Sequence, residues 1–143
     1  MDILSKLIQL APSGTNMELP PKIFLDMKGE FTEFVKGERL VARFPNYERY
    51  MNPFGFMQGG IIVAAIDNTI APLSYVSAPP NITKEINTTY KSPIKESDSY
   101  IQVIATIAKL TATHITLHAE VLNSKGKLAA LAIANCVFIK GHR

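Results

Sequence analysis

The chain has 143 residues, of which 47% are hydrophobic and 19% charged, a composition that indicates one globular domain and excludes a disordered chain. The formal net charge of +3 comes from scattered lysines and arginines, so no nucleic-acid-binding arm is indicated. Cys136 is the only cysteine, which excludes an intramolecular disulfide and a disulfide-stapled secreted scaffold.

The N-terminal stretch lacks the basic start and the long apolar core of a secretory signal peptide. Leu4, Leu7 and Ile8 have the spacing of a short amphipathic helix, and a loop rich in Pro, Ser, Gly and Asn follows over residues 12–21. We therefore expect an N-terminal helix and loop over residues 1–20 and a single domain over residues 21–143. The expected location is the cytoplasm.

The next stretch alternates between apolar and polar residues and predicts two strands over residues 31–44 with a turn between them. Residues 45–60 are irregular, and residues 61–76 are apolar on nearly every face, which together with their alanines favours a buried helix. Pro72 is expected to kink this helix or to mark its last turns. The run is too short for a membrane span and contains Asp67, which would cost about 2.5–3.5 kcal/mol at mid-bilayer.

The remainder of the chain is predicted to be strand, with segments at residues 81–91, 100–110, 114–122 and 128–139. The third of these alternates cleanly, and the fourth is apolar on both faces, which places it inside the sheet or covers it on both sides. A helix that is apolar all round needs a partner on every side. An α+β fold, in which a curved antiparallel sheet wraps one long helix, provides this. Such a sheet leaves open edges, and pairing with a second copy would close one of them.

The stretch NPFGFMQGGIIVAAIDNT, residues 52–69, carries the candidate chemistry. Gly59 and Gly60 open the helix, whose first amides lack internal partners and can hold an oxygen that becomes anionic during a reaction. The amide of Gly59 is the best candidate donor, and Asn52 can add a side-chain N–H. Asp67 is the only carboxylate between Glu48 and Glu85, so it is the only nearby general base or nucleophile.

Gly59 and Asp67 are eight residues apart, about 12 Å along a helix, which is too far for both to contact one carbonyl group. A working site would take its amide from one helix and its acid from another. Two antiparallel copies of the helix across a two-fold axis would form two such sites. The spacing therefore predicts a homodimer.

These residues resemble a known family. Asn52, Gln58-Gly59-Gly60 and Asp67 reproduce the spacing of the N-x5-HGG-x6-D signature of hotdog-fold acyl-CoA thioesterases of the PaaI-like, phenylacetate-type branch. The segment TKEINTTYKSP, residues 83–93, is similar to the next strand of that branch, which ends in N-x-x-Y-x-x-P. The resemblance covers residues 31–140.

The resemblance implies hydrolysis of an acyl-CoA thioester without metal or cofactor, at the interface of a homodimer or of a dimer of dimers. Asp67 would be the general base or nucleophile, the Gly59 amide the oxyanion donor, and Asn52 a group that holds the carbonyl or the water. Thr83 stands where related enzymes place a hydroxyl that orients water. Lysines near the strand end, Lys84, Lys91 and Lys95, are candidates for contacts to the phosphates of CoA. The residues expected to line the substrate site are Gln58, Gly60, Phe54, Met57, Lys84, Tyr90, Lys91 and Ser92.

One residue departs from the signature, because Gln58 stands where the family has histidine, and glutamine cannot transfer a proton. A non-catalytic protein that binds acyl-CoA or an acyl group is therefore an alternative. An enoyl-CoA hydratase or dehydratase is a weaker one, since it would need a histidine near the helix start, and a purely structural domain is the weakest. His114 and His118 lie four strand residues apart, about 13 Å, too far to share a metal ion.

Overall fold

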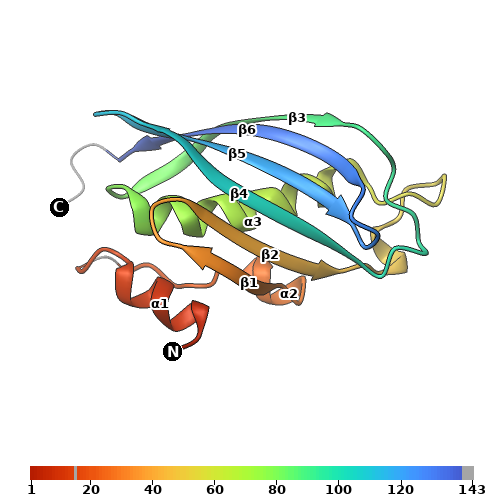
Figure 1. Ribbon diagram of the computed structural model, residues 1–143, viewed down its shortest axis with the longest axis horizontal. Helices are drawn as coiled ribbons and strands as arrows, with labels where there is room; N and C mark the ends of the chain where they lie inside the picture. The colour runs from red at the N-terminus through yellow and green to blue at the C-terminus, as the bar shows by residue number, and fades with distance from the viewer. Residues whose placement is uncertain (15, 140–143) are drawn as a thin grey trace.

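The computed structural model describes residues 1–14 and 16–139, so Lys140 and His142 lie outside the described part (Figure 1). Two short helices come first, and one long helix lies in the middle of a chain that is otherwise mostly strand. In chain order the elements are α1 Ile3–Leu10, α2 Lys22–Asp26, β1 Glu30–Val35, β2 Arg39–Pro45, a 3-10 turn Glu48–Tyr50, α3 Gly59–Ser77, β3 Asn81–Tyr90, β4 Tyr100–Leu110, β5 His114–Asn123 and β6 Leu128–Phe138.

The six strands form one antiparallel sheet in the order β1-β2-β4-β5-β6-β3, and the sheet curves around α3 (Figure 1). This confirms the predicted α+β architecture of a long helix wrapped by a curved antiparallel sheet. The clean alternation of β5 is also confirmed: Ile115, Leu117, Ala119 and Val121 are all buried against the helix. The apolar strand β6 lies between β5 and β3, as its sequence predicted, although Ile133 on its outer face is 48% exposed.

The central helix α3 begins at Gly59 and continues to Ser77, so Pro72 lies within its last turns. One face of it packs against the sheet, where Ile66, Ile70 and Leu73 are fully buried, whereas Ile61 and Ala64 are only partly buried. By length and mean hydropathy alone, the 19-residue helix could cross a membrane, which differs from the expectation of a run too short to span one. Its position inside the sheet shows that it serves as the core helix of this domain.

A buried polar network fixes the turn from α3 into β3. The amide of Asn81 donates to the carbonyl oxygens of Ser74 and Pro79, and its Oδ1 accepts a hydrogen bond from the Ser74 hydroxyl at 2.8 Å. Asn81 is 3% exposed and Ser74 is fully buried, and the Ser74 hydroxyl also donates to the carbonyl oxygen of Ala71 at 2.7 Å, so the buried polar groups of this turn are hydrogen-bonded. The network sends β3 back along α3 from the end of the helix toward its start.

One irregularity decides which residues of β3 face the helix. The register with β6 shifts between Thr83 and Glu85, so Lys84 is an extra residue in a β-bulge. Thr83 and Tyr90 are seven residues apart, and in a regular strand they would point to opposite faces. The extra residue in the bulge places the two side chains on the same face of the strand, and both reach α3.

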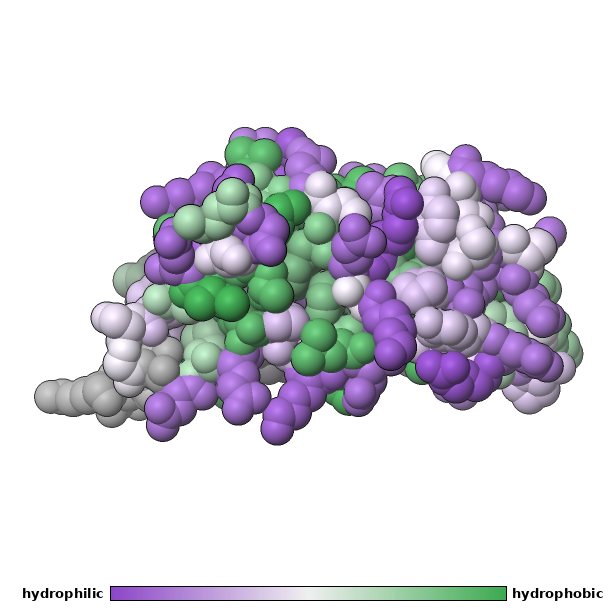
Figure 2. All heavy atoms as spheres, turned by 90° about the horizontal axis from the view of Figure 1, so that it is seen from below, coloured by the Kyte–Doolittle hydropathy of each residue, from purple (hydrophilic) through white to green (hydrophobic). Residues whose placement is uncertain are grey.

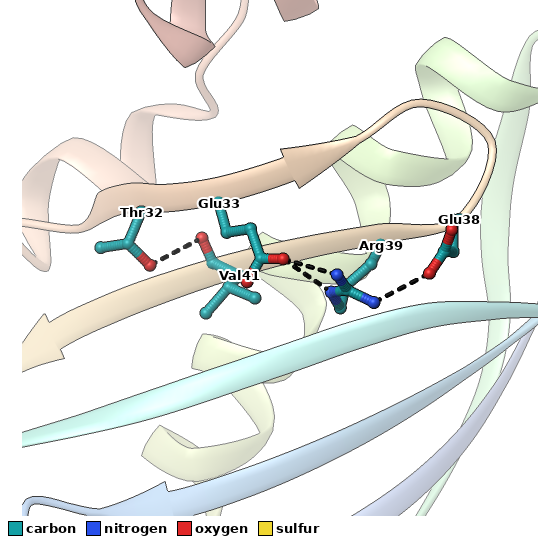
Figure 3. Close-up of polar contacts among 5 residues, drawn as sticks. All are labelled: Thr32, Glu33, Glu38, Arg39 and Val41. Atoms are coloured by element: carbon teal, nitrogen blue, oxygen red, sulfur yellow. Dashed lines mark hydrogen bonds and ion pairs between the residues drawn. The ribbon is translucent and has the colours of Figure 1, made fainter.

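The β1–β2 hairpin forms the end of the sheet opposite β3. The guanidinium of Arg39 donates to Glu33 at 2.6 Å and to Glu38 at 2.8 Å, on the solvent side of the hairpin (Figure 3). In the same hairpin the Thr32 hydroxyl donates to the carbonyl oxygen of Val41. These contacts help to set the strand register at the surface, where ion pairs add little to stability.

The short helix α2 is an element that the sequence did not indicate. Its Phe24 is 3% exposed and stacks on Phe31 at a ring-centroid distance of 4.3 Å, which ties the helix to β1. Two outward-facing residues, Ile23 and Leu25, are more than half exposed. Figure 2 views the molecule from below Figure 1, where α1 and α2 lie, and shows apolar surface interrupted by hydrophilic side chains.

Candidate active site

The carboxylate of Asp67 is half-buried on the side of α3 that faces β3. The hydroxyl of Thr83 donates a hydrogen bond to Asp67 Oδ1 at 3.0 Å, and the thiol of Cys136 in β6 lies 3.8 Å from Thr83 Oγ1, as donor to it. A half-buried carboxylate inside an apolar helix therefore has a hydroxyl partner, as burial of a charge requires. This chain of donors fixes one carboxylate oxygen and leaves Oδ2 without a hydrogen-bond partner among the described residues.

The negative charge of Asp67 contributes to the pKa shifts of two other side chains, Cys136 and Tyr75. Burial raises the pKa of the Cys136 thiol, and the negative charge of Asp67 raises it further. Burial also raises the pKa of Tyr75, again with a contribution from Asp67. Both groups therefore stay protonated and neutral at neutral pH, so neither adds a second negative charge near the carboxylate.

The helix start forms the second part of the candidate site. Gln58 is the N-cap residue, its own N–H donates to the carbonyl of Tyr50, and its exposed side chain makes no capping hydrogen bond. Within residues 1–14 and 16–139, the amides of Gly59 and Gly60 have no backbone acceptor. They are free donors at the positive end of the helix dipole.

Tyr90 closes one side of this helix start. Its hydroxyl donates to the carbonyl oxygen of Gly59 at 3.0 Å. A Cβ on Gly59 would lie 2.8 Å from this hydroxyl, whereas a Cβ on Gly60 would meet no atom within 4 Å. The first glycine therefore permits the close approach of Tyr90, and the second borders open space.

Asn52 folds the loop that precedes the helix. Its Oδ1 accepts hydrogen bonds from the amides of Phe54 at 2.9 Å and Phe56 at 3.1 Å. The carbonyl oxygen of the side chain is thus committed to the loop, and the Nδ2 group is the part that remains able to donate to a ligand. Phe54 projects from this loop and is 83% exposed, whereas Met57 is 4% exposed and packs in the core.

The predicted residues of the strand end lie at the surface. Lys84 and Lys91 are exposed, with Lys84 at the bulge on the outer face of the sheet, where it borders a cavity shared with Glu85 and Asn135. The Ser92 hydroxyl donates to the carbonyl oxygen of Leu128 at 2.7 Å, so it secures the strand end.

The described residues contain no group of three or more His, Cys, Asp and Glu side chains placed to hold a metal ion. His114 Nδ1 lies within hydrogen-bond distance of the hydroxyls of Thr111 and Thr113, and His118 is exposed on the same strand.

Within one chain the predicted catalytic residues form two separate groups. Asp67 and Thr83 meet at the middle of α3, and Gly59 lies at its start with Tyr90. Eight residues of α-helix separate Asp67 from Gly59, about 12 Å. The helix begins at Gly59, which is the condition on which the spacing argument for two chains depends.

The sheet edge beside both groups is open. In the described chain β3 pairs with β6 alone, and its other edge exposes Ile82 and Tyr90, each more than half accessible. An unpaired strand edge is a template for pairing with another chain. Cys136, which contacts the hydroxyl partner of the carboxylate, was not predicted as a site residue; only the tertiary contact between α3, β3 and β6 brings it there.

Known proteins resemble this chain in sequence and in structure. No family model matches the sequence. A candidate esterase from Saccharolobus solfataricus is 29% identical over 119 residues, which cover 82% of this chain and 81% of that protein.

Several solved structures share the fold. The PaaI protein from the phenylacetic acid degradation operon of Escherichia coli superposes with a TM-score of 0.78 at 14% identity, over 85% of this chain and 86% of the other. A mutant thioesterase from Pseudomonas aeruginosa gives 0.76 at 20% identity, over 96% and 94% of the two chains. A Streptococcus mutans protein bound to acetyl-CoA gives 0.71 at 21% identity, over 80% and 90%. The chain therefore has the hotdog fold that PaaI-like proteins share, which confirms the fold expected from the signature.

Proposed function

We propose that this protein hydrolyses an acyl-CoA thioester to a free acid and CoA. The observation that carries the proposal is the pairing of Asp67 with Thr83 in the middle of α3, on the side of the open β3 edge, together with the free amide of Gly59 at the start of that helix. A fixed carboxylate and a backbone oxyanion donor are the two parts that thioester hydrolysis needs. The thioesterase and the acetyl-CoA-bound protein among the structural neighbours support this choice of substrate class.

In the proposed reaction the Gly59 amide binds the thioester carbonyl oxygen and stabilises the negative charge that develops on it. As general base, Asp67 takes a proton from water while the water oxygen bonds to the carbonyl carbon. The C–S bond then breaks, and the proton passes to the departing CoA sulfur. The products are the carboxylic acid and the CoA thiol, and no metal or cofactor takes part. If Asp67 acts as nucleophile instead, its carboxylate displaces the CoA thiolate as the C–S bond breaks and an acyl–aspartyl anhydride forms. Water then cleaves the anhydride to the free acid and restores Asp67, and the proton that is released goes to the CoA thiolate.

The proposed active form is a homodimer, with a dimer of dimers as a further level of assembly. The 12 Å rise between Gly59 and Asp67 requires the amide of one chain and the acid of its partner at each site. The open edge of β3 is the surface along which such a pairing would form. The protein is proposed to act in the cytoplasm on a small-molecule thioester, without nucleic acid or membrane as partner.

The direct experiment is thiol release with a chromogenic disulfide reagent across short, long and aromatic acyl-CoAs. Cys136 is 1% exposed and its raised pKa keeps it protonated, so it should add little to the signal. Asp67→Asn should abolish release and leave the oligomer folded by circular dichroism and light scattering. Hydrolysis at the parental rate in the folded variant would rule out the role of Asp67.

A second candidate is a protein that binds acyl-CoA without cleaving it, and Gln58 in place of the signature histidine favours it. The Gln58 side chain is exposed at the helix start and makes no capping hydrogen bond, so it is available to a ligand, but it cannot transfer a proton. A thermal shift with acyl-CoAs in the absence of thiol release would select this candidate over hydrolysis.

A further inference from the structure

Tyr90 makes a hydrogen bond to the helix start through its hydroxyl, and this bond has a consequence for the neighbouring amide. The hydroxyl donates to the carbonyl oxygen of Gly59 at 3.0 Å. That carbonyl belongs to the same planar peptide unit as the N–H of Gly60, and in a trans peptide the two groups point in opposite directions. A hydrogen bond that holds the carbonyl of Gly59 therefore also sets the direction of the Gly60 N–H.

The surroundings of the two glycines fit this arrangement. On the Tyr90 side space is so short that a Cβ on Gly59 would lie 2.8 Å from the hydroxyl, so the peptide is held closely there. Gly60 is exposed, its N–H has no backbone acceptor among the described residues, and a Cβ there would meet nothing within 4 Å. One end of the peptide unit is thus fixed by protein and the other faces open space.

The hydrogen bond also changes the strength of the amide as a donor. A carbonyl that accepts a hydrogen bond polarises its peptide unit and makes the N–H at the other end more positive. In an α-helix the carbonyl of Gly59 also accepts a hydrogen bond from the amide four residues later. The hydrogen bond from Tyr90 therefore adds to the polarisation of the peptide unit that the helical hydrogen bond already causes.

Resting on the proposed function, we propose that Tyr90 is a positioning residue for a second oxyanion donor. It holds the Gly59–Gly60 peptide so that the Gly60 N–H acts beside the Gly59 N–H on the thioester carbonyl oxygen. Tyr90 touches the peptide and not the reacting atoms. The bulge at Lys84 makes this possible, because it places Tyr90 and Thr83 on the same face of β3.

The kinetic test compares two tyrosine hydroxyls. Tyr90→Phe should lower kcat about 2- to 10-fold with little change in KM, the range expected for loss of one neutral hydrogen bond. Tyr100→Phe is the matched control, because its hydroxyl also donates to a backbone carbonyl, that of Ser124 at 3.4 Å, from the outer face of the sheet. Tyr100→Phe should keep the parental kcat. Equal kcat values for both variants and the parent would overturn the proposal.

A second comparison asks whether Tyr90 acts through the Gly60 amide. Gly60→Pro removes this N–H within the first helical turn, where proline is tolerated, and Gly60→Ala keeps it. Tyr90→Phe should lower kcat in the Gly60→Ala background and have no further effect in the Gly60→Pro background. The same fall in both backgrounds would contradict a role through Gly60.

The third readout does not need enzyme activity. The chain has eight glycines, and Gly59–Gly60 is the only Gly-Gly pair, so labelling with 1-¹³C,¹⁵N-glycine identifies the Gly60 amide uniquely. In Tyr90→Phe the Gly60 amide proton should move upfield, and in Tyr100→Phe it should not. An unmoved Gly60 resonance would overturn this inference, whereas a parent protein that releases no thiol would overturn the proposed function.

Discussion

Gly59→Pro removes the backbone N–H that the proposed reaction uses and leaves a residue that suits its position. Gly59 is the first residue of α3, where proline is favoured because the N–H has no partner within the helix. Gln58 precedes it with φ −60° and ψ 136°, an extended conformation of the kind that a residue before proline adopts. The helix should therefore form normally without this amide.

The matched control is Gly59→Ala, which keeps the N–H. Both substitutions introduce a Cβ that would lie 2.8 Å from the Tyr90 hydroxyl, the far end of a side chain that can move, so the steric cost is shared. Loss of one oxyanion donor typically lowers kcat by about 10²–10³, which corresponds to about 2.7–4 kcal/mol in the activation free energy. We expect kcat of the proline variant to lie about 10²-fold or more below that of the alanine variant.

The assay is thiol release from the best acyl-CoA of the panel, with helix content and melting temperature measured for both variants. Similar melting temperatures would show that the comparison reports on the amide and not on folding. Equal kcat values for folded Gly59→Pro and Gly59→Ala would refute the reasoning that the Gly59 N–H stabilises the transition state.

The remaining predictions concern the carboxylate and the turn that positions it. Thr83→Val keeps the side-chain shape but removes the hydroxyl that donates to Asp67, and kcat should fall about 10-fold or more, since hydrogen bonds to charged groups contribute about 1.5–3 kcal/mol; a parental kcat would argue against this positioning role. Asn81→Ala removes the amide that donates to the carbonyl oxygens of Ser74 and Pro79 and should lower the free energy of unfolding in urea by about 1–3 kcal/mol, and an unchanged urea midpoint would contradict the importance of the network. The raised pKa of Cys136 means that the thiol of the folded protein keeps its proton at a pH where the unfolded chain loses it. The free energy of unfolding therefore has its full value below the unfolded thiol pKa of about 8.5, and the contribution from Cys136 is lost as pH rises through the higher folded pKa. Urea midpoints should fall less between pH 8 and pH 10 in Cys136→Ala than in the parent, and an equal fall would refute the assignment.

The sequence was sufficient for the parts of the fold that follow from local pattern. The alternation of β5 assigns every residue to a face, and an apolar helix with no polar side requires a surrounding sheet, so the wrapped architecture could be predicted. Helix α2 could not, because five residues after prolines carry too little periodicity to distinguish a helical turn from a loop.

The candidate site, too, could be predicted only where a local sequence pattern marks its residues. Asp67 and Gly59 stand out in the sequence because a lone acid and paired glycines are unusual in an apolar helix. The partners of these residues were less visible: Tyr90 reaches Gly59 across 31 positions, and the bulge at Lys84 exists only through pairing with β6. Tertiary pairing sets both features, and no local pattern of residues encodes them.

The central claim is that each site combines the carboxylate of Asp67 from one chain with the Gly59 amide of the other, and a mixed dimer tests it most directly. Asp67→Asn and Gly59→Pro chains, each inactive alone, are co-expressed with different tags and the heterodimer is purified through both. It should contain one intact site and show about half of the parental activity per dimer. Activity no higher than that of the two inactive homodimers, or a parent protein that is monomeric by light scattering, would contradict the account.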